Sequence, residues 1–192
     1  MSSRDEILAR VRRNQPAAVA LPSIPAFAQP AGAAVERFKA GVARMGGKVV
    51  DPPADGNLEA LVARLFPEAK VIASACEVPG NRSLAEARPA DLADVDVGVV
   101  RAVFGVAETG SVWLTDAQFG VDALGFLAQH LVVLLDPSRI VGSLHDAYRD
   151  AESFRARYGV FMTGPSATAD IEGILIHGAQ GIRSLTVVLA AP

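Results

Sequence analysis

The sequence predicts an α/β domain built on a mainly parallel sheet flanked by helices. Apolar runs typical of buried strands alternate with helical segments through the second half of the 192-residue chain. Apolar residues make up 51% of the chain and charged residues 20%, and the mean hydropathy is +0.30. That composition suits a sheet covered on both faces. The length fits one domain with an arm, so we expect an N-terminal helix and Pro-rich arm over residues 1–30 and a single domain over residues 31–192.

The N-terminal region predicts a helix followed by an extended arm. Residues 3–14 have an amphipathic pattern, with Ser3 as the expected N-cap and Glu6 in capping-box position. Four prolines within residues 16–30 predict an arm that contacts the domain or a neighbouring subunit, or alternatively a loose tail. The N-terminus lacks an apolar signal core and no apolar run is long enough to span a bilayer. We therefore expect a cytoplasmic protein without membrane insertion.

Periodicity and turn residues place the elements of the domain. Apolar residues at helical spacing, bounded by N-cap residues or glycine, predict helices over residues 33–45, 57–66, 119–129, 143–158 and 170–177. Short apolar runs predict strands within 48–51, 70–74, 92–100, 111–114, 130–135, 159–162 and 185–189. Ligands of parallel sheets bind outside the carboxyl ends of the strands. We expect the segments Thr163–Ser166 and Asp136–Ser138 to lie at such ends.

The stretch after the strand 159–162 is the first candidate site. Thr163-Gly164-Pro165 breaks the strand, and Ser166 or Thr168 can cap a helix whose first turn carries Asp170. A helix N-terminus presents free backbone N–H groups and favours an anion or a polar substrate. A well-capped turn between strand and helix, without a ligand, is the alternative. Ser166 lies outside a Gly-x-Ser-x-Gly sequence, so a ligand contact or a cap is favoured over a nucleophile.

Glu108 is the candidate catalytic residue. It lies between apolar residues in Val106-Ala-Glu-Thr-Gly110. We expect partial desolvation to raise the pKa of its carboxyl group, which suits general acid–base or nucleophilic chemistry. A carboxylate that accepts backbone N–H groups across a tight turn is an equal alternative. Thr109 and Gly110 complete this candidate site.

Charge and cysteine content narrow the classes of partner. The net charge is −3, the pI is about 5.6 and no basic stripe is present, so we expect no nucleic-acid partner. Cys76 is the only cysteine, whereas an iron–sulfur cluster usually needs four ligands. The three histidines lack zinc-site spacing, and neither a Gly-x-Gly-x-x-Gly nor a Walker A motif occurs. We expect no metal and no cofactor in this chain.

Three stretches together resemble the LUD-domain family, which includes lactate utilization protein C. They are residues 98–110 with Ala107-Glu-Thr-Gly-Ser111, the run His130-Leu-Val-Val, and Gly164-Pro-Ser-Ala-Thr-Ala-Asp-Ile-Glu172 continuing to Gly181. The last run is the most specific. The resemblance implies a fold like that of the NagB/RpiA/CoA-transferase group. It also implies a role in bacterial growth on L-lactate, alongside partner proteins that carry iron–sulfur clusters.

One departure from the family sequence matters for the chemistry. Where the family commonly ends Gly-Val-His-Gly-Pro, this chain has Gly178-Ala-Gln-Gly-Ile182, so Gln180 stands where the family has histidine. An amide can orient a substrate but cannot exchange protons near neutral pH as imidazole does. Binding is therefore a better-founded expectation than histidine-based catalysis.

The first hypothesis is an accessory subunit that contacts the iron–sulfur partner of a lactate utilization system. It binds a small carboxylate or phosphate-bearing metabolite at the crevice formed by Glu108, Thr109 and the Gly164–Asp170 turn. The second is a stand-alone enzyme of the CoA-transferase or sugar-phosphate isomerase kind that uses Glu108. A metabolite sensor with the arm as its partner contact is the third, and whether the chain catalyses a reaction stays open at this point. The ligand-binding candidates are Thr109, Gly110, Thr163, Gly164, Pro165, Ser166, Thr168, Asp170 and Gln180.

Overall fold

A five-stranded parallel sheet forms the centre of the domain in the computed structural model, which describes residues 2–20, 22–25, 33–150, 154–169, 175–177 and 181–192. The strand order is β1-β11-β6-β3-β2, and every pairing is parallel. The bounds are β1 Lys48–Val50, β2 Ile72–Ser74, β3 Val97–Arg101, β6 His130–Leu135 and β11 Ser184–Leu189. The predicted α/β class with a mainly parallel sheet is confirmed.

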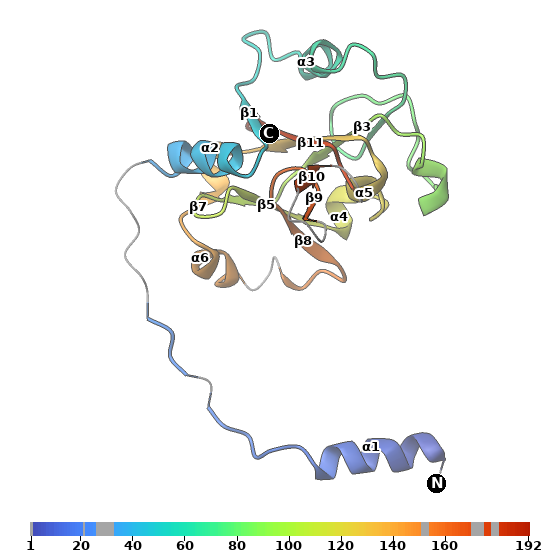
Figure 1. Cartoon of the computed structure of the whole chain (residues 1–192), viewed down its shortest axis with the longest axis vertical. Coiled ribbons are helices and arrows are strands. Elements are labelled where there is room, and N and C mark those ends of the chain that lie inside the picture. Colours follow the sequence, from blue (N-terminus) through green and yellow to red (C-terminus); the bar gives the residue numbers. More distant parts are fainter. Residues whose placement is uncertain (1, 21, 26–32, 151–153, 170–174, 178–180) are drawn as a thin grey trace.

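Both faces of this sheet are buried, as the composition predicts. Along β6, Leu131, Val133 and Leu135 belong to one apolar cluster, whereas Val132 and Leu134 belong to another. This alternation follows from the two-residue period of a strand. Helix α3 (Leu58–Leu65) covers one face, and the other face meets helix α2 (Ala34–Arg44) and a second sheet (Figure 1). Asn57 caps α3 through the Ala60 N–H at 2.9 Å, as the sequence predicts.

The second sheet is mixed and was not predicted as a separate layer. Its order is β7-β4-β5-β8, with bounds β4 Phe104–Val106, β5 Ser111–Thr115, β7 Ile140–Val141 and β8 Gly159–Met162. β5 pairs antiparallel with both β4 and β8, and β4 pairs parallel with β7. One face of β5 contributes Val112 and Leu114 to the main core, and the other contributes Trp113 to an aromatic cluster. β4 and β5 are buried at every position for this reason.

The prediction of a helix over residues 170–177 is wrong for residues 175–177, the part of that segment that the structure describes. Strand β9 (Ala167–Ala169) pairs antiparallel with β10 (Leu175–His177), so His177 lies in a strand and not at a helix end. Thr168 and Ile176 are opposite each other in the register. Cap residues such as Ser166 and Thr168 also suit strand entry after a turn, which is why the local pattern misleads. Asp170 and Gln180 lie outside the described residues.

Three shorter helices replace two predicted long ones. The segment 119–129 contains α5 (Leu124–Leu127), and α4 (Asp116–Phe119) precedes it and ends at Gly120 with φ 67°. Only Leu144–Tyr148 of the segment 143–158 is described as helix, α6, and Ser143 caps it as expected. Short 3₁₀ turns lie at Pro89–Leu92 and Pro137–Arg139.

Helix α1 (Ser3–Arg13) stands apart from the domain (Figure 1). Its cap is Ser2, with Asp5 as the reciprocal partner, one residue earlier than the Ser3 and Glu6 pair that we expected. None of its residues is buried, and Ile7 is 61% exposed. Within the described part of the chain, every helix is too short or too polar to cross a membrane.

Backbone contacts between glycines fix α2 on the second sheet. Gly110, in the β4–β5 turn, has φ 70°, and a Cβ atom on it would lie 2.3 Å from the carbonyl carbon of Gly41 in α2. A Cβ atom on Gly41 would lie 2.8 Å from the Gly110 nitrogen. Real Cβ atoms do not approach backbone this closely, so neither position accommodates a side chain without displacing α2.

We expect Gly110→Ala to lower the free energy of unfolding by about 3 kcal/mol, since overpacking costs about 1–3 kcal/mol and the positive φ about 1 kcal/mol more. Gly56→Ala is the matched control, because Gly56 also has φ 70° but no atom lies within 4 Å of its added Cβ. Gly56→Ala should lower the free energy of unfolding by only about 1 kcal/mol. Urea denaturation of both variants measures the difference, and equal losses would contradict the packing argument.

The exposure of α1 predicts that residues 1–30 contribute little to the stability of the domain. Deleting them should change the free energy of unfolding by less than about 0.5 kcal/mol, the usual range for surface changes. The full chain is the control in the same urea titration. A loss of several kcal/mol would mean that the arm packs on the domain in solution.

Candidate functional site

A pocket of ≈ 490 Å³ brings Glu108, Thr109 and Thr163 together. We call it the hydroxyl pocket. Five elements contribute to its walls: the end of α2, the β4–β5 turn, the start of β5, α6 and the end of β8. Its lining residues are Arg44, Met45, Glu108, Thr109, Ser111, Leu144, Tyr148, Phe161 and Thr163. The pocket therefore joins the two sequence stretches that were separate candidates, one around Glu108 and one beginning at Thr163.

Three hydroxyl groups form a hydrogen-bonded chain in this pocket. The Ser111 hydroxyl donates to Thr109 Oγ1 at 2.7 Å, and Ser111 Oγ lies 2.6 Å from Thr163 Oγ1. A serine hydroxyl carries a single proton, so Thr163 is the donor in the second bond. The Thr109 proton can then be directed toward a molecule in the pocket. Ser111 is only 2% exposed, which holds the chain in one arrangement.

Glu108 is exposed, so the expected desolvation of its carboxylate is wrong. Its Oε2 atom accepts the Leu144 N–H at 3.0 Å, at the first residue of α6. Its backbone N–H donates to the Gly142 carbonyl at 3.2 Å. This arrangement corresponds to the alternative expectation, a carboxylate that satisfies a backbone N–H group. Glu108 thereby links the β4–β5 turn to α6.

Gly110 and Gly164 lack side chains, so the backbone at each lies close to the backbone at the end of α2 and shapes the pocket. Gly110 contacts α2 at Gly41, and Gly164 has φ 71° with its hypothetical Cβ only 2.1 Å from the Met45 carbonyl oxygen. The ends of β8 and of the β4–β5 turn therefore both press against the end of α2. This contact places Arg44 and Met45 in the pocket wall. Gly110 and Gly164 act here as packing residues.

Pro165, Ser166 and Thr168 follow Gly164 in the chain. Pro165 is buried, and the Ser166 N–H donates to the Ile182 carbonyl at 2.9 Å, so the segment after Gly164 is fixed to the loop before β11. Thr168 is placed by its backbone in β9. Pro165, Ser166 and Thr168 are not among the described residues that line the hydroxyl pocket.

Thr163–Ser166 and Asp136–Ser138 both follow the ends of strands, as expected, but these strands belong to different sheets. Thr163 follows β8 in the mixed sheet, whereas Asp136 follows β6 in the parallel sheet. Asp136 Oδ1 instead accepts the Ser138 N–H at 2.8 Å and caps a 3₁₀ turn. Alternation of strands and helices in the sequence does not reveal that two sheets are present.

Sequence reasoning missed several lining residues. Ser111 lies two residues after Thr109, on the other side of Gly110. Two hydroxyl residues at this spacing across a glycine turn are a local sequence pattern that could have identified Ser111 as a site residue. Arg44 donates from Nη2 to the Glu108 carbonyl at 3.2 Å and sits in the last turn of α2, where arginine is also favoured by the helix dipole. Tyr148 and Phe161 form an aromatic wall with ring centroids 6.0 Å apart. Only the fold brings these two residues together.

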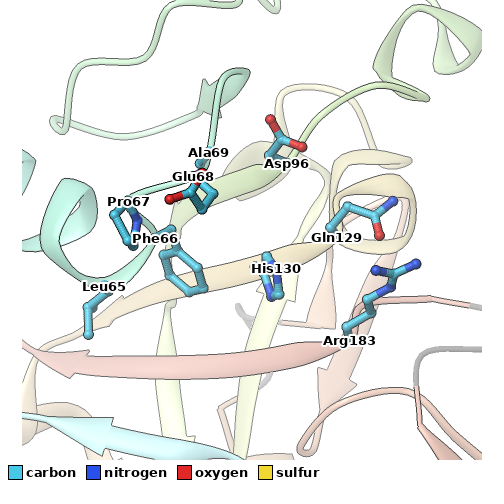
Figure 2. Close-up of a pocket in the computed structure, with 9 residues that line it drawn as sticks. All are labelled: Leu65, Phe66, Pro67, Glu68, Ala69, Asp96, Gln129, His130 and Arg183. Atoms are coloured by element: carbon cyan, nitrogen blue, oxygen red, sulfur yellow. The ribbon is translucent and has the colours of Figure 1, made fainter.

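A second pocket, of ≈ 320 Å³, lies at the amino edge of the parallel sheet, where β3, β6 and β11 begin (Figure 2). His130 forms its floor. The imidazole stacks on Phe66 with centroids 4.8 Å apart, and its Nδ1 lies 2.8 Å from Ser184 Oγ. Burial, with a further contribution from the positive charge of Arg183, lowers the pKa of His130 below 6.5. The ring is therefore neutral near pH 7.

Among the described residues, no group of three or more histidine, cysteine, aspartate or glutamate side chains is arranged to hold a metal ion.

The model of the LUD domain family matches residues 80–190, more than half of the chain. The chain belongs to the LUD-domain family. The matched residues include both the Glu108 turn and the strands β8 and β9.

Two known proteins are similar to this LUD-domain chain. The uncharacterized protein NMB1437 from Neisseria meningitidis is 28% identical over 102 residues, which cover 52% of this chain and 44% of that protein. The chain thus matches less than half the length of this relative. A crystal structure of a DUF162 family protein from Deinococcus radiodurans has a TM-score of 0.65 at 18% identity, covering 83% of this chain and 98% of that one. At this identity the likeness establishes the fold.

The lowered pKa of His130 predicts a pH dependence of stability. As the pH falls below 6.5, the unfolded chain binds a proton at this residue before the folded chain does. The free energy of unfolding therefore falls over that interval and is fully retained above it. In His130→Gln, the free energy of unfolding measured in urea titrations should therefore change less with pH below 6.5.

The control is the same pair of proteins at about pH 8, where the imidazole is neutral in both states and any difference reports packing alone. An unchanged slope below pH 6.5 in His130→Gln would contradict the assignment.

Proposed function

We propose that this LUD-domain chain binds a small carboxylate-bearing metabolite in the hydroxyl pocket and acts as an accessory subunit of a bacterial L-lactate utilization system. The observation that carries the proposal is the hydroxyl chain Thr109–Ser111–Thr163 beside the Arg44 guanidinium. Membership of the LUD-domain family supports the link to lactate utilization. In this proposal the oxidation itself takes place on an iron–sulfur partner protein.

The pocket has complementary parts for such a metabolite. Arg44 supplies a positive charge, and its guanidinium retains donors beyond the one on the Glu108 carbonyl. The Thr109 hydroxyl supplies a neutral donor. Met45, Leu144 and Phe161 supply apolar surface for the carbon skeleton. A carboxylate bound by Arg44 and Thr109 would therefore direct its remaining atoms toward the aromatic wall. A phosphate-bearing metabolite offers oxygens to the same donors.

The alternative proposal, an enzyme of the CoA-transferase or isomerase kind that uses Glu108, has less support. The Glu108 carboxylate is exposed and already accepts the Leu144 N–H. A nucleophile or general base gains from a less solvated environment. Glu108→Gln distinguishes the two proposals, because an enzyme would lose turnover whereas a binding subunit would retain metabolite affinity within a few-fold.

Binding is tested by isothermal titration with L-lactate, pyruvate and glycerol phosphate. We expect at least one to bind, and Arg44→Gln to weaken it roughly tenfold, because a hydrogen bond to a charged group contributes about 1.5–3 kcal/mol and the guanidinium is partly solvated. Thr109→Val should also weaken it. Arg64→Gln, at an exposed position of α3 outside the pocket, is the matched control. Affinity unchanged in both pocket variants would contradict the assigned site.

The accessory role is tested separately. Tagged chain should co-purify an iron–sulfur protein from cells grown on L-lactate, and a deletion strain should grow poorly on L-lactate but normally on pyruvate. Complementation with Arg64→Gln should restore growth, and complementation with Arg44→Gln should restore it only partly. Normal growth of the deletion strain on L-lactate would overturn this role without affecting the binding result.

A further inference from the structure

The hydroxyl pocket is larger and more apolar than a three-carbon acid requires. Its volume of ≈ 490 Å³ lies within the range of about 300–1,000 Å³ that is usual for pockets that enclose drug-sized ligands. Besides its polar groups, the lining includes four large apolar or aromatic side chains, Met45, Leu144, Tyr148 and Phe161. Met45 is 45% exposed and Tyr148 is 62% exposed, so both can contact a ligand. A molecule of the size of lactate would leave most of this apolar surface in water.

The hydroxyl chain ends in two groups of opposite hydrogen-bonding character. Ser111 donates its single proton to Thr109 and accepts the proton of Thr163. Thr109 therefore has a proton to donate into the pocket, whereas Thr163 offers lone pairs. Both outer oxygens bond the same Ser111 Oγ, at 2.7 and 2.6 Å, so they lie at most about 5 Å apart. A ligand that carries an acceptor and a donor on neighbouring carbons can reach both of them at once.

The polar and aromatic groups follow one another in a fixed order along the pocket. At one end, Arg44 Nη2 donates to the carbonyl of Glu108, the residue before Thr109, so the guanidinium lies beside the Thr109 hydroxyl. At the other end, Phe161 and Thr163 are two residues apart at the end of β8, and side chains at this spacing lie on the same face of a strand. The order is therefore a cation, a donor, an acceptor and an aromatic ring.

The aromatic end of the pocket is held by further rings beneath it. Phe161 packs on Trp113 with ring centroids 4.5 Å apart, and Tyr148 stacks on Phe154 at 4.8 Å. Phe154 also contacts Trp113 at 4.6 Å, so the exposed ring of Tyr148 is connected to this cluster. A surface that is already ordered loses little conformational freedom on binding, and contact with one more ring is favourable.

We propose that the hydroxyl pocket selects a 2-hydroxy acid with an aromatic side chain. Arg44 and Thr109 bind the carboxylate, and Thr163 accepts the proton of the 2-hydroxyl group. The ring lies against Phe161 and Tyr148. The inference rests on the proposed function in one respect, that carboxylates bind in this pocket, and it does not depend on the accessory role in lactate utilization.

Isothermal titration of the full chain with three acids tests this order of groups. The acids are phenyllactate, hydrocinnamate, which lacks the 2-hydroxyl, and lactate, which lacks the ring, and the chiral acids are titrated as separate enantiomers. One enantiomer of phenyllactate should bind at least about tenfold more tightly than lactate, because it buries an aromatic ring. It should bind about threefold to tenfold more tightly than hydrocinnamate, which is the usual effect of one neutral hydrogen bond.

Variants separate the two ends of the pocket. Thr163→Val should weaken phenyllactate to the affinity of hydrocinnamate and leave hydrocinnamate unchanged, since Thr109 keeps its bond from Ser111. Tyr148→Ser should weaken both acids that carry a ring and leave lactate unchanged. Phe126→Ser is the matched control, because it removes another exposed ring, in α5 and outside the pocket. This control should bind all three acids like the original chain.

Ser111→Ala tests the role of Ser111 as a positioning residue that sets the direction of both outer hydroxyls. Without Ser111 neither direction is fixed, so phenyllactate should lose its advantage over hydrocinnamate, whereas both acids should still bind through Arg44. A purely structural effect would weaken both acids by the same factor. Circular dichroism checks that each variant is folded, and Thr163→Val tests the same hydrogen bond if Ser111→Ala does not fold.

Three results would each overturn this inference. They are phenyllactate binding no tighter than lactate, phenyllactate binding no tighter than hydrocinnamate, and an equal loss of both ring-bearing acids in Thr163→Val. Any of these, together with lactate binding that Arg44→Gln weakens, would leave the proposed function in place. Absence of binding by all three acids would overturn both proposals. Normal growth of the deletion strain on L-lactate, with phenyllactate bound as expected, would overturn only the accessory role.

Discussion

The approach of two backbones at Gly41 and Gly110 is the constraint on which the hydroxyl pocket depends. Because neither residue has a side chain, the β4–β5 turn reaches α2 directly. Gly164 makes a similar approach to the carbonyl of Met45 from the end of β8. Three elements from different parts of the sequence are thus fixed at one helix end. The frame of the pocket is main chain, so lining side chains such as Tyr148 and Phe161 can differ without moving it.

The fold was predictable where the local pattern and the tertiary environment agree. The apolar run 130–135 is a central strand with the predicted bounds, and Asn57 caps α3 as its side chain predicts. Prediction was wrong where one local signal serves two structures. Ser166 and Thr168 follow a Gly-Pro turn, and hydroxyl residues there suit a capped helix as well as a strand. Pairing of β9 with β10 decides between them, and that contact is not local.

The candidate site was predictable in part for the same reason. Thr109 and Thr163 were identified from separate motifs, and the structure brings them to one pocket through Ser111. The burial expected for Glu108 was wrong, because apolar neighbours in sequence alternate across β4 and β5 and point into two cores. The turn between those strands carries Glu108 outward. Neighbours in the sequence therefore describe the strands well but describe the solvation of a turn residue poorly.

Strand β6 connects the surroundings of both pockets. It begins at His130, on the floor of the second pocket. The chain after its end leads through β7 to Gly142, whose carbonyl accepts the Glu108 N–H. β6 pairs with β3 on one side and β11 on the other, and its residues from Leu131 to Leu135 are fully buried. A strand held in this way does not slide, because sliding would break both ladders at once. We therefore expect β6 to transmit no displacement between the two pockets, so that ligands bound in both would stabilise the fold additively.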